Sequence, residues 1–155
     1  MEIAIDDPAH SEVVALLADH LADMHATSPA ESVHALDVSG LLDPAVTFWT
    51  ARRDGSVLGC AALKELAPDH GEVKSMRTTA AARGAGIGAA LVRHVINEAG
   101  ARGYAHLSLE TGSQDFFAPA RRLYARHGFV ECGPFGDYRD DPMSVFMEKR
   151  LPLPM

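Results

Sequence analysis

The residues of this sequence best suited to chemistry are three glycines that alternate behind an arginine. The segment RGAGIG, residues 83–88, lies between a β-rich run and an amphipathic helical pattern. Glycine lets the backbone approach a ligand closely and adopt positive φ angles without steric cost. The first turn of the following helix adds unpaired N–H groups and the positive end of the helix dipole. Together with the charge of Arg83, these groups predict a binding site for a phosphate or pyrophosphate.

The glycine turn also matches part of the fingerprint of dinucleotide-binding folds. The glycine spacing is present in GAGIGA, residues 84–89, and Glu110 lies about 20 residues further on, where a ribose-binding acid belongs. In that fold, however, the first strand runs directly into the turn. Here residues 79–83 intervene, and about half of the chain comes first. A dinucleotide-dependent oxidoreductase stays an alternative, as does a helix start that only needs small residues.

A second motif lies downstream, in the pattern AxxLYxxxGF of residues 120–129. Residues 76–88 resemble the acetyl-CoA signature of the GNAT superfamily of N-acetyltransferases, and residues 120–129 look like its second signature. The core of the first signature, Arg/Gln-x-x-Gly-x-Gly/Ala, corresponds to Arg83, Gly86 and Gly88. Both motifs occur in the right order, at strand–turn–helix and helix–strand junctions. The resemblance therefore implies an enzyme that transfers an acetyl group from acetyl-CoA to an amine.

The resemblance also implies which residues bind acetyl-CoA. In the superfamily the strand before the glycine turn, here residues 72–78, splays from its neighbour and binds the pantetheine arm with free backbone groups. Phe117 stands where an asparagine often contacts the cofactor, so Ser113 or Gln114 is expected to replace that contact. The predicted cofactor-binding residues are Met76, Arg77, Thr78, Arg83, Gly84, Ala85, Gly86, Ile87, Gly88 and Ser113.

Three side chains are candidates for the chemistry of transfer. By the resemblance, Tyr124 is the general acid, since a phenol with a pKa of about 10 suits a weakly basic thiolate leaving group. The alternative is that Tyr124 packs in the core. Glu72 is the first candidate for the base that deprotonates the amine, because some relatives carry a glutamate near this position, and Glu110 is the second. Either acid can equally be a solvated carboxylate at a strand end, and a chain of waters can replace a dedicated base.

No motif encodes the acceptor. The resemblance implies a small-molecule or peptide amine, and the acidic net charge favours a cationic one. Arg77 is a candidate for binding an acceptor carboxylate, or it balances nearby acids. The late loop, residues 133–142, is expected to take part in acceptor choice. A homodimer is one option for the assembly, and a non-catalytic acyl-CoA-binding sensor is the alternative to an enzyme.

The candidate residues must be positioned by secondary-structure elements, and the sequence shows strand and helix patterns in alternation. Asp54-Gly55 predicts a hairpin, and helical spacing predicts an apolar stripe through Val14 and Leu17. The expected strands are 2–6, 46–51, 56–66, 72–78, 104–111, 129–132 and 143–149, and the expected helices are 11–27, 30–42, 87–102 and 116–127. This order predicts an α/β (mixed α+β) fold, a GNAT-like twisted mixed sheet of about seven strands with helices on both faces.

Composition narrows the class of protein further. With 155 residues, 47% of them hydrophobic, the chain suits one domain over residues 1–155. A formal net charge of −7 argues against nucleic-acid binding, and no apolar run is long enough to span a membrane. Two cysteines, Cys60 and Cys132, are typical of a reduced, cytoplasmic protein. None of the eight histidines has metal-ligand spacing, so no metal is expected.

Overall fold

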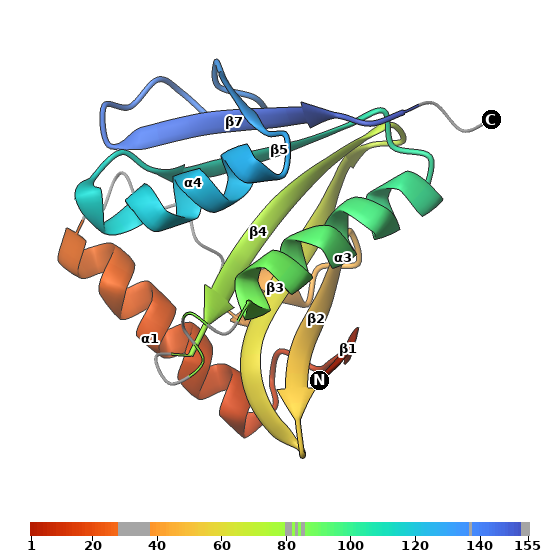
Figure 1. Ribbon diagram of the computed structural model, residues 1–155, viewed down its shortest axis with the longest axis vertical. Coiled ribbons are helices and arrows are strands. Elements are labelled where there is room, and N and C mark those ends of the chain that lie inside the picture. The colour runs from red at the N-terminus through yellow and green to blue at the C-terminus, as the bar shows by residue number, and fades with distance from the viewer. Residues whose placement is uncertain (28–37, 80–81, 83, 85, 137, 153–155) are drawn as a thin grey trace.

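The described part of the chain forms a seven-stranded mixed sheet in the order β1-β2-β3-β4-β5-β7-β6 (Figure 1). The computed structural model describes residues 1–27, 38–79, 82, 84, 86–136 and 138–152. The elements are β1 (Glu2–Ile5), α1 (Ser11–Thr27), α2 (Val38–Leu41), β2 (Val46–Arg53), β3 (Ser56–Ala67), β4 (His70–Thr78), α3 (Ile87–Ala101), β5 (His106–Gly112), a 3₁₀ turn (Asp115–Phe117), α4 (Ala118–Arg126), β6 (Val130–Cys132) and β7 (Ser144–Arg150). The predicted order of elements and the mixed sheet are confirmed.

The antiparallel half of the sheet is built around the predicted hairpin. β2 and β3 pair up to Arg53 beside Ser56, and Asp54 and Gly55 connect them with φ angles of 52° and 81°. Two positive φ angles are what a type I′ turn requires, and an Asp-Gly pair tolerates them well. The prediction of paired strands joined at Asp54-Gly55 is therefore confirmed.

The sheet divides between β4 and β5, which run parallel. The two strands are paired from His70 beside His106 to Val73 beside Leu109. Both continue beyond this short pairing, and Figure 1 shows them diverging from their common end. The splay expected for residues 72–78 is present, and it opens a wedge in the middle of the sheet.

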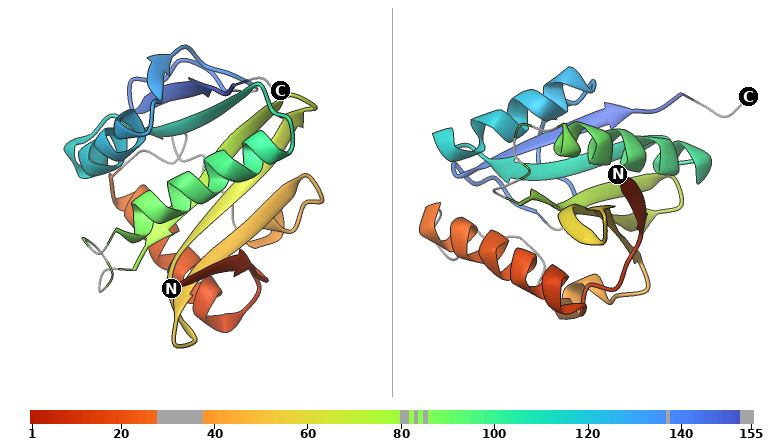
Figure 2. Two further views of the ribbon diagram at one scale, coloured as in Figure 1. Left: turned by 45° about the vertical axis from the view of Figure 1, so that its right-hand side comes forward. Right: turned by 60° about the horizontal axis from the view of Figure 1, so that its bottom comes forward.

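Helices cover both faces of the sheet, with α3 and α4 on one face and α1 on the other (Figure 2). α1 buries Val13 and Leu17 against the sheet, but Val14, predicted to be on the apolar stripe, is 39% exposed. Val13 and Val14 are both apolar and both lie at helical spacing from Leu17, so periodicity alone did not determine which of the two faces the sheet. α3 buries its regular apolar stripe, Ile87, Leu91, Val95 and Ala99.

Two helix predictions differ in extent from the structure. Most of the helix predicted over 30–42 lies outside the described residues, and α2 is its described end. The helix predicted over 116–127 begins as a 3₁₀ turn and becomes α4, with Pro119 in its first turn, where no N–H is needed. Within the described ranges, no helix is both long enough and apolar enough to cross a membrane.

Candidate active site

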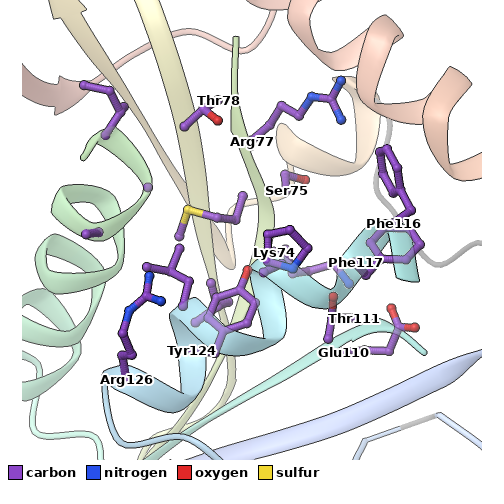
Figure 3. Close-up of a pocket in the computed structure, with 18 of the residues that line it drawn as sticks. Lys74, Ser75, Arg77, Thr78, Glu110, Thr111, Phe116, Phe117, Tyr124 and Arg126 are labelled. Atoms are coloured by element: carbon purple, nitrogen blue, oxygen red, sulfur yellow. The ribbon is translucent and has the colours of Figure 1, made fainter. Parts of the chain in front are cut away.

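An open cleft occupies the wedge between the splayed ends of β4 and β5 (Figure 3). Its volume is about 660 Å³, and β4, β5, the start of α3 and one face of α4 line it. Arg83 and Ala85 lie outside the described residues. The cleft brings together most of the other predicted site residues: Glu72, Met76, Arg77, Thr78, Gly84, Gly86, Ile87, Gly88, Glu110 and Tyr124.

The glycine turn forms the start of α3 at one side of the cleft. Gly84 and Gly86 have φ angles of 81° and 79°, in the left-handed region where other residues are strained. Gly86 is the N-cap of α3, and among the described residues no side chain caps the first N–H groups of this helix. Those groups are therefore available to an anion in the cleft. Gly88 serves packing instead, because a Cβ there would lie 3.1 Å from Leu123 Cδ2 on α4.

Two arginines of α4 have different roles. Arg126 lines the cleft and adds positive charge to it. Sequence reasoning missed Arg126, although it falls within the second motif. Arg121 is half-buried, and its Nη1 donates hydrogen bonds to the carbonyl oxygens of Gly112 (2.6 Å) and Gln114 (2.9 Å). Arg121 thereby ties α4 to the end of β5, where the cleft begins.

β4 is bulged where it borders the cleft. Ser75 has a φ angle of 54°, and the register with β3 shifts at this point. Burial raises the pKa of the Cys60 thiol to about 12, and Sγ donates to the carbonyl oxygen of Ser75 at 3.2 Å. Ser75 and Arg77, two positions apart, point toward Phe116, whereas Thr78 points to the other side of β4, as the ordinary alternation of a strand requires (Figure 3).

Tyr124 lies on α4 with its ring buried and its hydroxyl at the cleft (Figure 3). The residue is 7% exposed, and its ring packs edge-on against Phe129 with 5.8 Å between centroids. No hydrogen bond joins the hydroxyl to another described residue. Burial raises the pKa of the Tyr124 phenol well above its ordinary value, and the nearby carboxylate of Glu110 raises it further. Tyr124 is therefore both a packing residue and a protonated group that faces the cleft.

Glu72 is held at the other wall of the cleft by two neighbours. It is 4% exposed, and its Oε2 accepts hydrogen bonds from Tyr138 Oη (2.6 Å) and Lys74 Nζ (3.0 Å). Lys74 Nζ also donates to Tyr138 Oη at 2.8 Å. Burial, together with the charge of Glu72, raises the pKa of the Tyr138 phenol far above its ordinary value. Glu72 is thus not a solvated strand-end carboxylate, and we call the three residues the Glu72 clamp.

Sequence reasoning did not single out Lys74 or Tyr138 as parts of the site. Tyr138 belongs to the late loop that was expected to influence acceptor choice, but no motif marks it. Its contact with Glu72 joins residues 66 positions apart, so only the folded chain brings them together. The cleft is therefore closed on this side by a loop that precedes β7.

Glu110 and Ser113 lie at and beyond the end of β5. Glu110 lines the cleft, and its Oε2 accepts a hydrogen bond from Ser144 Oγ at 2.7 Å. Ser113 is not among the residues that line the cleft, and its Oγ donates to the carbonyl oxygen of Pro142 at 2.6 Å. The structure therefore brings Glu110, but not Ser113, to the side of Tyr124.

Comparison with known proteins identifies the family. The model of the acetyltransferase (GNAT) family matches residues 13–129. The chain belongs to this family. It is 50% identical to the uncharacterized N-acetyltransferase YsnE of Bacillus subtilis (strain 168), over 97% of this chain and 100% of YsnE. It is also 42% identical to the IAA acetyltransferase of Azospirillum brasilense, over 96% of this chain and 97% of that protein.

A solved structure agrees with the GNAT assignment. A Klebsiella pneumoniae protein assigned as an acyl-CoA N-acyltransferase superposes with a TM-score of 0.79 at 29% identity, over 97% of both chains. The chain is therefore an acyltransferase with the GNAT fold, and acetyl-CoA is the donor that the family uses. The dinucleotide interpretation of the glycine turn is wrong for this fold. Among the described residues, no group of three His, Cys, Asp or Glu side chains could hold a metal ion.

Proposed function

We propose that this GNAT protein transfers an acetyl group from acetyl-CoA to the primary amine of a small molecule or peptide. The observation that carries the proposal is that one cleft joins the glycine turn to Tyr124, Glu72 and Glu110. A donor that is anchored by its phosphates at the start of α3 can reach along the wedge between β4 and β5. Its thioester then meets the groups that the chemistry needs.

The donor is bound by the backbone of the turn and of β4. The uncapped N–H groups after Gly86 receive the pyrophosphate, and Arg83 and Arg126 supply positive charge. β4 has no pairing with β5 beyond Val73, so the backbone near Met76 is free to bind the pantetheine arm. An N–H group there also stabilises the oxyanion that forms when the thioester is attacked.

Glu72 is the proposed base. The clamp uses its Oε2 twice, and no described residue donates a hydrogen bond to Oε1. Oε1 can therefore accept a proton from the ammonium group of the acceptor. The neutral amine then attacks the thioester carbonyl, and a carbon–nitrogen bond forms. Glu110 is the second candidate, since it lines the same cleft and lies near Tyr124.

Tyr124 is the proposed general acid. When the carbon–sulfur bond breaks, the departing thiolate takes the proton of the Tyr124 hydroxyl. The raised pKa keeps this phenol protonated at neutral pH, so the proton is present when it is needed. Solvent then returns a proton to Tyr124 for the next cycle.

The proposal is tested by titrating the protein with acetyl-CoA in a calorimeter and then assaying thiol release with a panel of primary amines. We expect acetyl-CoA to bind alone, and thiol release to accelerate when a suitable amine is added. Mass spectrometry of the amine should show the added acetyl group. Tight acetyl-CoA binding without acceleration by any amine class would instead favour the non-catalytic sensor.

Cytoplasmic location and a homodimer remain predictions. The structure contains two free cysteines, Cys60 and Cys132, which is compatible with a reducing compartment. Cell fractionation tests the location, and sedimentation of the purified protein tests the assembly.

A further inference from the structure

Ser75 is a buried polar residue of the cleft whose hydroxyl has no partner in the described part of the chain. It is 7% exposed and lines the cleft, and its φ angle of 54° is one that a serine rarely adopts. A buried hydroxyl without a hydrogen bond and a strained backbone both cost stability. When they occur together at a cleft, they indicate a group that a ligand completes.

Arg77 adds a cation beside this hydroxyl. It lines the cleft and points to the same side of β4 as Ser75 (Figure 3). A guanidinium presents a planar fork of N–H donors that matches a carboxylate, and a hydroxyl can donate to the same anion. Positive charge here stands out in a protein with a formal net charge of −7. The side of β4 that carries Ser75 and Arg77 is therefore suited to a carboxylate.

An apolar surface lies across the cleft from these donors. Phe116 is 45% exposed, although it lines the cleft, and its ring meets Phe117 edge-on with 4.9 Å between centroids. Figure 3 shows both rings on the side toward which Arg77 extends. An exposed aromatic ring in a cleft favours a ligand that covers it with an apolar group.

Acidic groups mark a third region, close to Tyr124. Glu72 and Glu110 line the cleft there, and Glu72 Oε1 accepts no hydrogen bond from the described residues. Lys74 pairs with Glu72 at Oε2, so the carboxylate of Glu110 leaves this region with a net negative charge. An ammonium group is attracted to the region and is deprotonated there under the proposed function. The acceptor half of the cleft thus presents separate places for an anion, an apolar group and an amine.

We propose that the acceptor is an amine that also carries a carboxylate and a large apolar side chain, as an aromatic amino acid does. Its carboxylate accepts hydrogen bonds from Arg77 and Ser75, its side chain covers Phe116, and its amine faces Glu72. This inference rests on the proposed acetyl transfer and narrows its substrate class.

The first test compares phenylalanine with 2-phenylethylamine, which has the same ring and amine but no carboxylate. Thiol release is measured with acetyl-CoA at saturation, and kcat/KM is determined for each amine. We expect kcat/KM to be about ten- to a hundredfold higher for phenylalanine, the size expected for hydrogen bonds to a charged group. Equal or higher kcat/KM for 2-phenylethylamine would overturn the inference.

The second test measures the same ratio in variants. Arg77→Met and Ser75→Ala should each reduce the preference for phenylalanine about tenfold. Ser75→Ala should leave the melting temperature unchanged or raise it, because the substitution removes an unsatisfied hydroxyl. If Arg77→Met does not fold, the Ser75→Ala variant alone decides the test. Arg53→Met is the control, since Arg53 is exposed and lies outside the cleft. An unchanged preference in folded Ser75→Ala and Arg77→Met proteins would contradict the inference.

The two proposals fail in different ways. If acetyl-CoA binds but neither these two amines nor any other amine accelerates thiol release, the proposed transfer is wrong and the inference falls with it. If amines without a carboxylate are acetylated at least as efficiently as phenylalanine, the transfer stands and only the substrate class is wrong.

Discussion

Tyr124 combines a packing role with the proposed role in proton transfer. Its ring fills space beside Phe129, and its hydroxyl is the part that reaches the cleft. Because burial and the charge of Glu110 raise the pKa of this phenol, the hydroxyl stays protonated throughout the neutral range. The two interpretations that the sequence left open, core residue and general acid, are compatible, because they concern different atoms of the same side chain.

Replacing Tyr124 with Phe separates these roles. Tyr124→Phe keeps the ring, so the fold and the affinity for acetyl-CoA should change little. The rate should fall by roughly ten- to a thousandfold, since general acid catalysis typically contributes ~10²–10⁴ and water can partly substitute. The loss should appear in kcat more than in KM, because the interaction develops as the thiolate leaves. If Tyr124→Phe transfers acetyl at the wild-type rate in single-turnover experiments, Tyr124 is a packing residue only.

Replacing Glu72 with Gln tests the base. Glutamine keeps the shape and an acceptor oxygen for Tyr138 and Lys74, but it does not take up a proton. We expect kcat/KM to fall by about 10²–10⁴ at neutral pH. The defect should shrink at higher pH, where the amine is already neutral. Glu110→Gln is the matched control, and a larger loss in that variant would assign the base to Glu110.

At the scale of elements, the glycine turn at the start of α3 is the proposed anchor of the donor. Gly86→Val places a branched side chain at a φ angle of 79°, at the N-cap of α3. Since a branched residue is strained in this conformation, the first N–H groups should move. Calorimetry should show at least a tenfold loss of acetyl-CoA affinity. Gly100→Val is the control, because a Cβ there meets nothing within 4 Å, and equal affinity of folded Gly86→Val and wild type would contradict the anchoring role.

Elements whose conformation is determined by residues close together in the sequence could be predicted. The regular apolar stripe of α3 and the Asp54-Gly55 hairpin both have local causes, and the two signature motifs located the turn and Tyr124. The Ser75 bulge could not be predicted, because it depends on the register of β4 against β3 and on Cys60. The contact of Tyr138 with Glu72 was equally inaccessible, since no local pattern links a loop residue to a strand 66 positions earlier.

At the scale of the whole molecule, the tyrosines should make stability sensitive to alkaline pH. The chain has three tyrosines, and the pKa of each phenol is raised, first of all by burial, in Tyr104, Tyr124 and Tyr138. The unfolded chain therefore loses these protons at lower pH than the folded protein does. Their stabilising contribution is complete below pH 10 and is lost as the pH rises above that value.

Urea unfolding between pH 8 and pH 11 measures this effect. For each fully buried tyrosine, the free energy of unfolding should fall by about 1.4 kcal/mol per pH unit above pH 10. Tyr124→Phe should have a shallower slope than wild type in this range, because one titrating phenol is gone. Identical slopes in the two proteins would show that Tyr124 ionises as readily in the folded state as in the unfolded chain.

The splay of β4 and β5 gives this sheet two edges in its interior, in addition to those at β1 and β6. An edge with unpaired N–H and C=O groups invites a stray extended chain to add itself as another strand, the first step toward aggregation. Natural sheets protect their outer edges with bulges and with charged side chains. β4 has both along its unpaired stretch, in the bulge at Ser75 and the charge of Arg77. The residues proposed to bind the acceptor are thus also expected to keep another polypeptide from adding a strand to the opened sheet.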